Sequence, residues 1–189
     1  MSQTGSRSAY LKARNVFDCW VLALRVHDLI VEGRIKKEWL NTQAEIKFSD
    51  GNSGIKISPT KYVDTIVKIS ENLTRTALGT CFIAFDEALT DLFGDLPKDT
   101  NNDLDSLRII IHLMRCSFAH NPAEPKWDIR LNNRKKIKIQ KINFVIDFGQ
   151  LNGKLVKFEH HDGSEGLTKL MSYCFETIKN EENINLKQV

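Results

Sequence analysis

Residues 104–118 read LDSLRIIIHLMRCSF, and this stretch decides the fold. Apolar side chains recur in it at alternating intervals of three and four residues: Leu104, Leu107, Ile111, Met114 and Phe118. That spacing predicts a helix packed in a bundle. Ile110 and Leu113 widen the apolar surface, so we expect this helix to be covered on more than one side and to be central to the fold. Asn121 and Pro122 should end it.

Three more helices are predicted around this central one. Residues 10–31 have apolar side chains at helical spacings, and Gly33 follows where a helix would stop. Residues 58–93 begin with a Ser-Pro-Thr start signal, and they form either one long helix with a bend at Gly79 or two collinear helices. Residues 165–180 form the last helix, with a frayed tail from Asn180 onward. The bundle therefore comprises residues 10–122 and 165–180.

A β-hairpin is predicted between the last two helices, within about residues 136–159. Apolar side chains alternate at Phe144, Ile146 and Phe148, and Asn152-Gly153 reads as a tight turn before residues 155–158. The fold class is thus mainly α with an appended C-terminal β-hairpin. Residues 33–58 form an insertion without a clear pattern, with a flexible tip at residues 50–54.

Length and composition indicate one soluble domain covering residues 1–189. The formal net charge of +3 is too small for a strongly cationic nucleic-acid coat. The four cysteines lack the short spacings of zinc or redox motifs, which predicts reduced thiols. With neither a signal peptide nor a membrane-spanning stretch, we expect a cytoplasmic protein that does not bind membranes.

The strongest functional motif is residues 115–120, RCSFAH, at the end of the central helix. An arginine holds two phosphate oxygens and neutralises their charge, and a histidine exchanges protons near neutral pH. Arg115 and His120 are therefore candidate catalytic residues for phosphodiester chemistry that requires neither a metal nor a cofactor. They would not meet on a regular helix, so we expect Asn121-Pro122 to unwind the last turn and bring His120 back.

Arg108 and His112 lie on the same flank of this helix as Arg115, at intervals of four and three residues. We assign Arg108, His112 and Asn121 as candidate substrate-binding residues. The alternative is structural: the strip is the solvated border of a bundle helix, and Arg115 and His120 bind the carbonyl groups at its end.

Three further groups of residues are weaker candidates. His160, His161 and Asp162 suggest either a metal site or a polar turn. Asp86 does not pair with Glu87 for carboxylate catalysis, but one of the two is expected to form a salt bridge with the cationic strip. The basic run 130–138 either contacts RNA phosphates or forms a strand edge protected by lysines.

An arginine, four residues and a histidine late in a buried helix resemble the motif of the HEPN domains, helical bundles that often act as ribonucleases. The resemblance covers the helical parts, from Tyr10 to Pro122 together with the last helix, and makes the hairpin an elaboration. The residue after the arginine, often asparagine in the family, is Cys116 here.

The resemblance implies a metal-independent endoribonuclease of a toxin or defence type. The ribose 2′-hydroxyl would attack the neighbouring phosphate, with His120 as the acid or base and Arg115 on the phosphate. In the family, a second subunit usually completes the site, which implies a homodimer, RNA as substrate and an antitoxin protein as a partner. The alternative is a non-catalytic HEPN-like module that binds nucleic acid, nucleotide or a protein.

Overall fold

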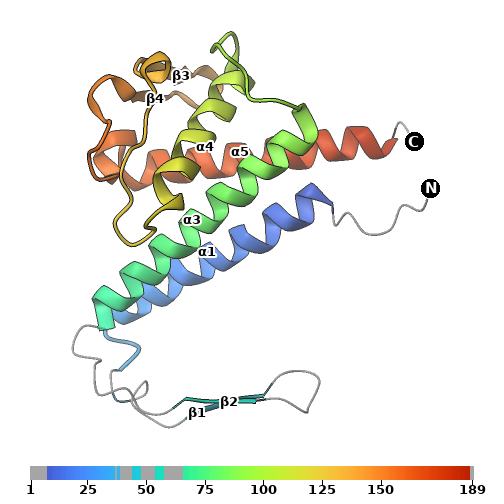
Figure 1. Cartoon of the computed structure of the whole chain (residues 1–189). Helices are drawn as coiled ribbons and strands as arrows, with labels where there is room; N and C mark the ends of the chain where they lie inside the picture. The colour runs from blue at the N-terminus through green and yellow to red at the C-terminus, as the bar shows by residue number, and fades with distance from the viewer. Residues whose placement is uncertain (1–7, 37, 39–43, 48–53, 58–65, 188–189) are drawn as a thin grey trace. The chain divides into compact units, whose positions relative to one another are not determined.

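A computed structural model describes residues 8–36, 38, 44–47, 54–57 and 66–187 of the chain. It confirms a mainly helical fold, built from α1 (Ala9–Val31), α3 (Ile66–Phe93), α4 (Asp103–Ala119) and α5 (Gly163–Lys187) (Figure 1). The chain divides into two compact parts, Met1–Trp20 with Arg75–Val189, and Val21–Thr74. Both α1 and α3 contribute to each part, and the parts are described separately below.

The central helix of the larger part is α4, as its sequence predicts. Ten of its 17 residues are buried, and they include Ile110 and Leu113 outside the predicted seam. The helix begins at Asn102, whose side chain accepts a hydrogen bond from the Asp105 backbone N–H at 2.8 Å. Asp103 and Asp105 in the first turn add negative charge where the helix dipole favours it.

In the larger part, aromatic rings join α1 and α5. The Phe17 ring stacks on the rings of Phe85 and Phe175, at centroid distances of 6.3 and 5.3 Å. The Tyr10 backbone N–H donates a hydrogen bond of 2.8 Å to the Glu182 carboxylate. The predicted frayed tail from Asn180 is therefore wrong: α5 continues to Lys187, because its last turns meet the start of α1.

A two-stranded antiparallel hairpin follows α4, but the predicted turn is wrong. Strand β3 (Lys136–Ile139) pairs with β4 (Phe144–Asp147), and the connection is residues 140–143, where Asn143 has the left-handed φ of 48°. Asn152-Gly153 follows both strands and does not join them; the Asn152 side chain instead accepts a hydrogen bond from the Ile129 N–H. The alternation Phe144, Ile146, Phe148 correctly predicts buried side chains.

The hairpin is fixed to the central helix by its connection as well as by its apolar face. Strand β3 packs against α4. The Asp103 carboxylate, at the start of α4, accepts hydrogen bonds from the backbone N–H groups of Gln140 and Lys141 at 2.7 and 2.8 Å. Lys136 and Lys138 are exposed, whereas Ile137 and Ile139 are buried, as expected for a strand edge protected by lysines.

In the smaller part, the second half of α1 lies against the first half of α3. The His27 ring is 2.8 Å from the Ser70 hydroxyl, and the Thr74 hydroxyl donates to the Ala23 carbonyl at 3.3 Å. Strand β1 (Ala44–Lys47) pairs antiparallel with β2 (Gly54–Ile57), a hairpin that the sequence did not predict. The predicted helix start at residues 58–60 and most of the predicted tip lie outside the described residues.

No helix in the described part of the chain combines the length and apolar character needed to cross a membrane.

Gly79 lies on α3 against Phe118 of α4, and α3 is one continuous helix through it. A Cβ atom at this position would lie 3.0 Å from Phe118 Cδ1 and 3.2 Å from Phe118 Cβ. The absence of a side chain at Gly79 therefore lets the Phe118 ring pack against α3, where it also contacts the Phe82 ring at a centroid distance of 5.5 Å.

We expect Gly79→Val to lower the free energy of unfolding by about 1–3 kcal/mol, because the branched side chain overpacks the contact with Phe118. Thr76→Val, at an exposed position of the same helix, is the matched control and should change it by less than about 0.5 kcal/mol. Urea denaturation followed by circular dichroism measures both. Equal stabilities would contradict a close approach of the two helices at Gly79.

Candidate functional site

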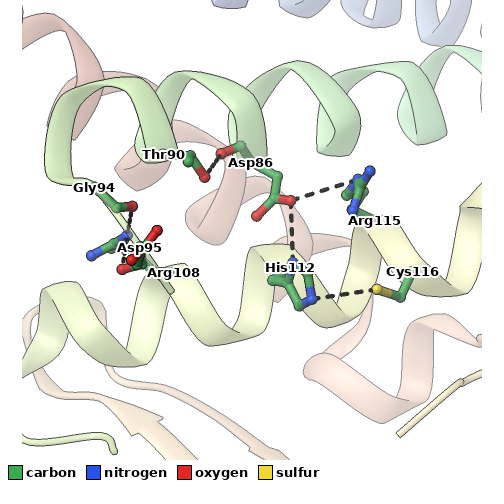
Figure 2. A network of polar contacts seen from close by, with 8 residues as sticks. All are labelled: Asp86, Thr90, Gly94, Asp95, Arg108, His112, Arg115 and Cys116. Carbon is green, nitrogen blue, oxygen red and sulfur yellow. Dashed lines mark hydrogen bonds and ion pairs between the residues drawn. The ribbon is translucent and has the colours of Figure 1, made fainter. Parts of the chain in front are cut away.

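The candidate site is a polar cluster between α3 and α4, shown in Figure 2. Asp86 on α3 points at α4, and its carboxylate oxygen Oδ2 lies 3.2 Å from His112 Nδ1 and 3.6 Å from Arg115 Nε. The Asp86 side chain is only 12% exposed. The prediction that an acidic residue of this helix pairs with the cationic strip is confirmed for Asp86. One carboxylate therefore orients two cationic side chains of the central helix.

His112 carries a positive charge at neutral pH in this arrangement. The hydrogen bond to Asp86 is the main cause that raises its pKa to about 9, with a further contribution from Cys116, while burial opposes the shift. Both ring nitrogens of the protonated form are N–H donors. One faces Asp86, and the other faces Cys116.

Cys116 is the fourth member of the cluster, and its role was missed at the level of sequence. Its Sγ lies 3.6 Å from His112 Nε2, one helical turn away on α4. The side chains of Asp86, His112 and Cys116 therefore form a continuous row of hydrogen-bonding groups (Figure 2). The signal available in the sequence was the spacing of four residues between His112 and Cys116, which places both on one helix face.

Arg108 has a different environment from the rest of the predicted cationic strip. It is buried, and its guanidinium donates hydrogen bonds to the backbone carbonyls of Phe93, Gly94 and Asp95 at 3.4, 2.5 and 2.6 Å. These carbonyls end α3, where a cation stabilises the helix dipole. Arg108 thus holds the connection between α3 and α4, and its predicted contact with substrate would compete with these bonds.

His120 caps the C-terminal end of α4 and is exposed. It lines a surface cavity of about 410 Å³ together with Asn121, Lys126 and other residues of the segment after α4. The Asn121 side-chain oxygen accepts hydrogen bonds from the Ala123 and Glu124 N–H groups at 3.2 and 3.3 Å, which closes the turn. A substrate contact by Asn121 would therefore use its amide nitrogen.

The structure does not bring the two predicted catalytic residues together within one chain. Arg115 contacts Asp86, and no hydrogen bond or ion pair joins it to His120 among the described residues. The Arg115 side chain is 41% exposed, and Asp86 binds only its Nε atom. Its two terminal nitrogens therefore remain free for an external ligand, as far as the described residues show.

The predicted metal candidates His160 and His161 are not members of this cluster, whereas Arg130 of the basic run lines a surface cavity together with His112 and Cys116. His160 Nδ1 accepts hydrogen bonds from Trp127 Nε1 and from the Lys157 N–H, at 3.0 and 3.2 Å, and burial lowers its pKa. The neighbouring His161 is buried, which also lowers its pKa. Among the residues that the structure describes, no group of three or more His, Cys, Asp or Glu side chains is arranged to hold a metal ion. The geometry of His160 is that of a polar turn.

Comparison of the chain with protein-family models, with curated proteins and with solved structures found no match. A functional interpretation of the chain therefore rests on its mainly helical fold and on the chemistry of its own side chains.

The charge on His112 predicts a pH-dependent stability. Its pKa in the folded chain, about 9, exceeds the ordinary value of 6.5, so the protonated ring stabilises the native state below about pH 6.5 and this contribution disappears as the pH rises through 9. We expect the stability advantage over His112→Gln to fall by roughly 1–2 kcal/mol between pH 6.5 and 9.5, after allowance for partial exposure.

Unfolding in urea at the two pH values measures this difference, and the glutamine variant serves as the control because it cannot titrate. NMR of the histidine rings gives the midpoint directly. A His112 midpoint near 6.5 would show that its pairing with Asp86 is not formed in solution.

Proposed function

We propose that the chain is a HEPN-like, metal-independent endoribonuclease of a toxin or defence type, acting as a homodimer. The observation that carries the proposal is the state of Arg115: Asp86 contacts its Nε atom, its side chain is 41% exposed, and among the described residues none pairs with its two terminal nitrogens. A guanidinium fixed on one side and free on the other is suited to hold two oxygens of a phosphate.

The charge of the cluster supports the same proposal. Asp86 carries one negative charge, whereas His112 and Arg115 each carry a positive charge at neutral pH. His112 offsets much of the Asp86 charge, so the carboxylate positions Arg115 without cancelling its attraction for an anion. A net positive charge remains at the place where a phosphodiester would bind.

In the proposed reaction, Arg115 holds the scissile phosphate and neutralises the charge that grows on its oxygens. The ribose 2′-hydroxyl attacks the phosphorus, His120 exchanges the proton, and the products carry a cyclic phosphate and a 5′-hydroxyl. Because His120 does not contact Arg115 within one chain, the His120 that acts with a given Arg115 would come from the second chain of the dimer.

Purified protein incubated with RNA and excess chelator should generate cyclic-phosphate ends. Arg115→Ala and His120→Ala should each lower the cleavage rate by about 100-fold or more, because each removes a group that acts in the transition state. Arg14→Ala, which removes an exposed arginine paired with Asp18 on α1, is the matched control and should retain the wild-type rate. Undiminished cleavage by Arg115→Ala would end the proposal.

Mixing the two inactive variants tests the composite site. A heterodimer of Arg115→Ala and His120→Ala contains one site with both substitutions and one site with neither, so an equal mixture with random exchange of subunits should regain about a quarter of the wild-type rate, and a pure heterodimer about half. Absence of recovery in a mixture that forms heterodimers would place both residues of a site on one chain.

The separation of Arg115 and His120 within the chain also favours a second function, a non-catalytic HEPN-like module that binds nucleic acid, nucleotide or a protein. Such a module would bind RNA through Arg115 but leave it intact. The chelator assay distinguishes the two, because a clean dimer that retains RNA in a gel-shift experiment and cleaves none of it is the binding module.

A further inference from the structure

The proposed reaction makes no use of Cys116, although its sulfur lies at the end of the row of groups from Asp86 through His112. The thiolate, not the thiol, is the attacking form of a cysteine, and a neighbouring imidazolium N–H is a partner that stabilises it. His112 provides such a partner at 3.6 Å, and Asp86 fixes the orientation of its ring. The arrangement is that of a nucleophile, a base and an orienting carboxylate.

The polar surroundings of Cys116 distinguish it from the other three cysteines. The Cys116 Sγ lies 3.6 Å from His112 Nε2, and the hydrogen bond to Asp86 is the main cause that raises the pKa of His112 to about 9. The other three cysteines have no comparable partner. Cys81 and Cys174 are buried, and burial raises the pKa of both thiols; Cys19 is exposed on α1 and makes no hydrogen bond within the described residues.

Cys116 lines a surface cavity of about 430 Å³. Cys116 and His112 line it together with two cations, Lys98 and Arg130, and one anion, Asp128. Two asparagines and the apolar side chains of residues 96, 97 and 113 complete its walls. With His112 protonated, positive charge exceeds negative charge around the cavity, so an anionic ligand is favoured.

We propose that Cys116 is a nucleophilic thiol site that takes a small anionic disulfide in this cavity. The Cys116 thiolate attacks one sulfur of the disulfide, a new S–S bond forms, and the old S–S bond breaks. The departing sulfur leaves with the bonding electron pair and takes a proton from the His112 imidazolium. Cys116 is oxidised to a mixed disulfide, and half of the reagent is reduced to a thiol.

This proposal does not depend on ribonuclease activity. It assigns to the His112 side of the cluster a chemistry separate from that of Arg115, and its readout is a covalent adduct of known mass.

The test uses the full-length reduced protein and glutathione disulfide at pH 7, with the adduct on each cysteine followed in time by peptide mass mapping after acid quenching. Cys116 should react at least about tenfold faster than Cys19, although Cys19 is the more exposed thiol. Accessibility alone predicts the reverse order. Equal rates, or a faster Cys19, would overturn the proposal without any variant.

His112→Gln should slow the modification of Cys116 about tenfold and leave Cys19 unchanged. The buried Cys81 and Cys174 report whether this variant is folded, because they become modified only if the chain opens. A folded His112→Gln with the wild-type Cys116 rate would refute the role of the imidazole.

The charge of the ligand is tested with a second reagent. Bis(2-hydroxyethyl) disulfide is neutral, so the preference of Cys116 for glutathione disulfide over this reagent, relative to Cys19, should fall in the double variant Lys98→Gln, Arg130→Gln. If the wild-type chain shows no such preference, the cavity does not select an anion, and the proposal is wrong in its ligand class.

Discussion

A carboxylate that is nearly removed from water needs cations or hydrogen-bond donors around it. The Asp86 side chain is only 12% exposed, so the packing of the helices around it must supply such partners. Its partners, His112 and Arg115, both belong to α4, so the pairing fixes the rotation of α4 relative to α3. The apolar seam of α4 would tolerate a range of rotations, because hydrophobic contact is not directional. The polar cluster selects one of them.

The functional consequence of this selection is that one carboxylate serves two different chemical groups. Asp86 contacts Arg115 at Nε and leaves its side chain 41% exposed, and it contacts His112 at Nδ1 and leaves Nε2 facing the Cys116 sulfur. The proposed phosphate-binding residue Arg115 and the proposed nucleophile Cys116 thus occupy adjacent positions of one helix. Loss of the carboxylate would disturb both, which makes Asp86 a positioning residue for the entire site.

The helices and the buried face of the hairpin could be predicted because they depend on local pattern: the three-and-four spacing of α4 and the alternation at Phe144 to Phe148 are visible in the chain. What failed depends on distant partners. The end of α5 is set by the contact of Glu182 with Tyr10. The Asn152 side chain accepts a hydrogen bond from the Ile129 N–H and does not form a hairpin turn. The contact of Cys116 with His112 could have been predicted from their spacing of four residues. The burial of Arg108 against the carbonyls of Phe93 to Asp95 could not.

The guanidinium of Arg108 has a consequence for how this chain tolerates changes in length. By binding three successive carbonyls, it clamps the connection between α3 and α4 to a fixed number of residues. Surface loops usually accept insertions at small cost, but here an extra residue would pull the carbonyls away from the clamp. Deletions and insertions in this loop are therefore disfavoured, and the loop would be a poor place to graft a reporter domain.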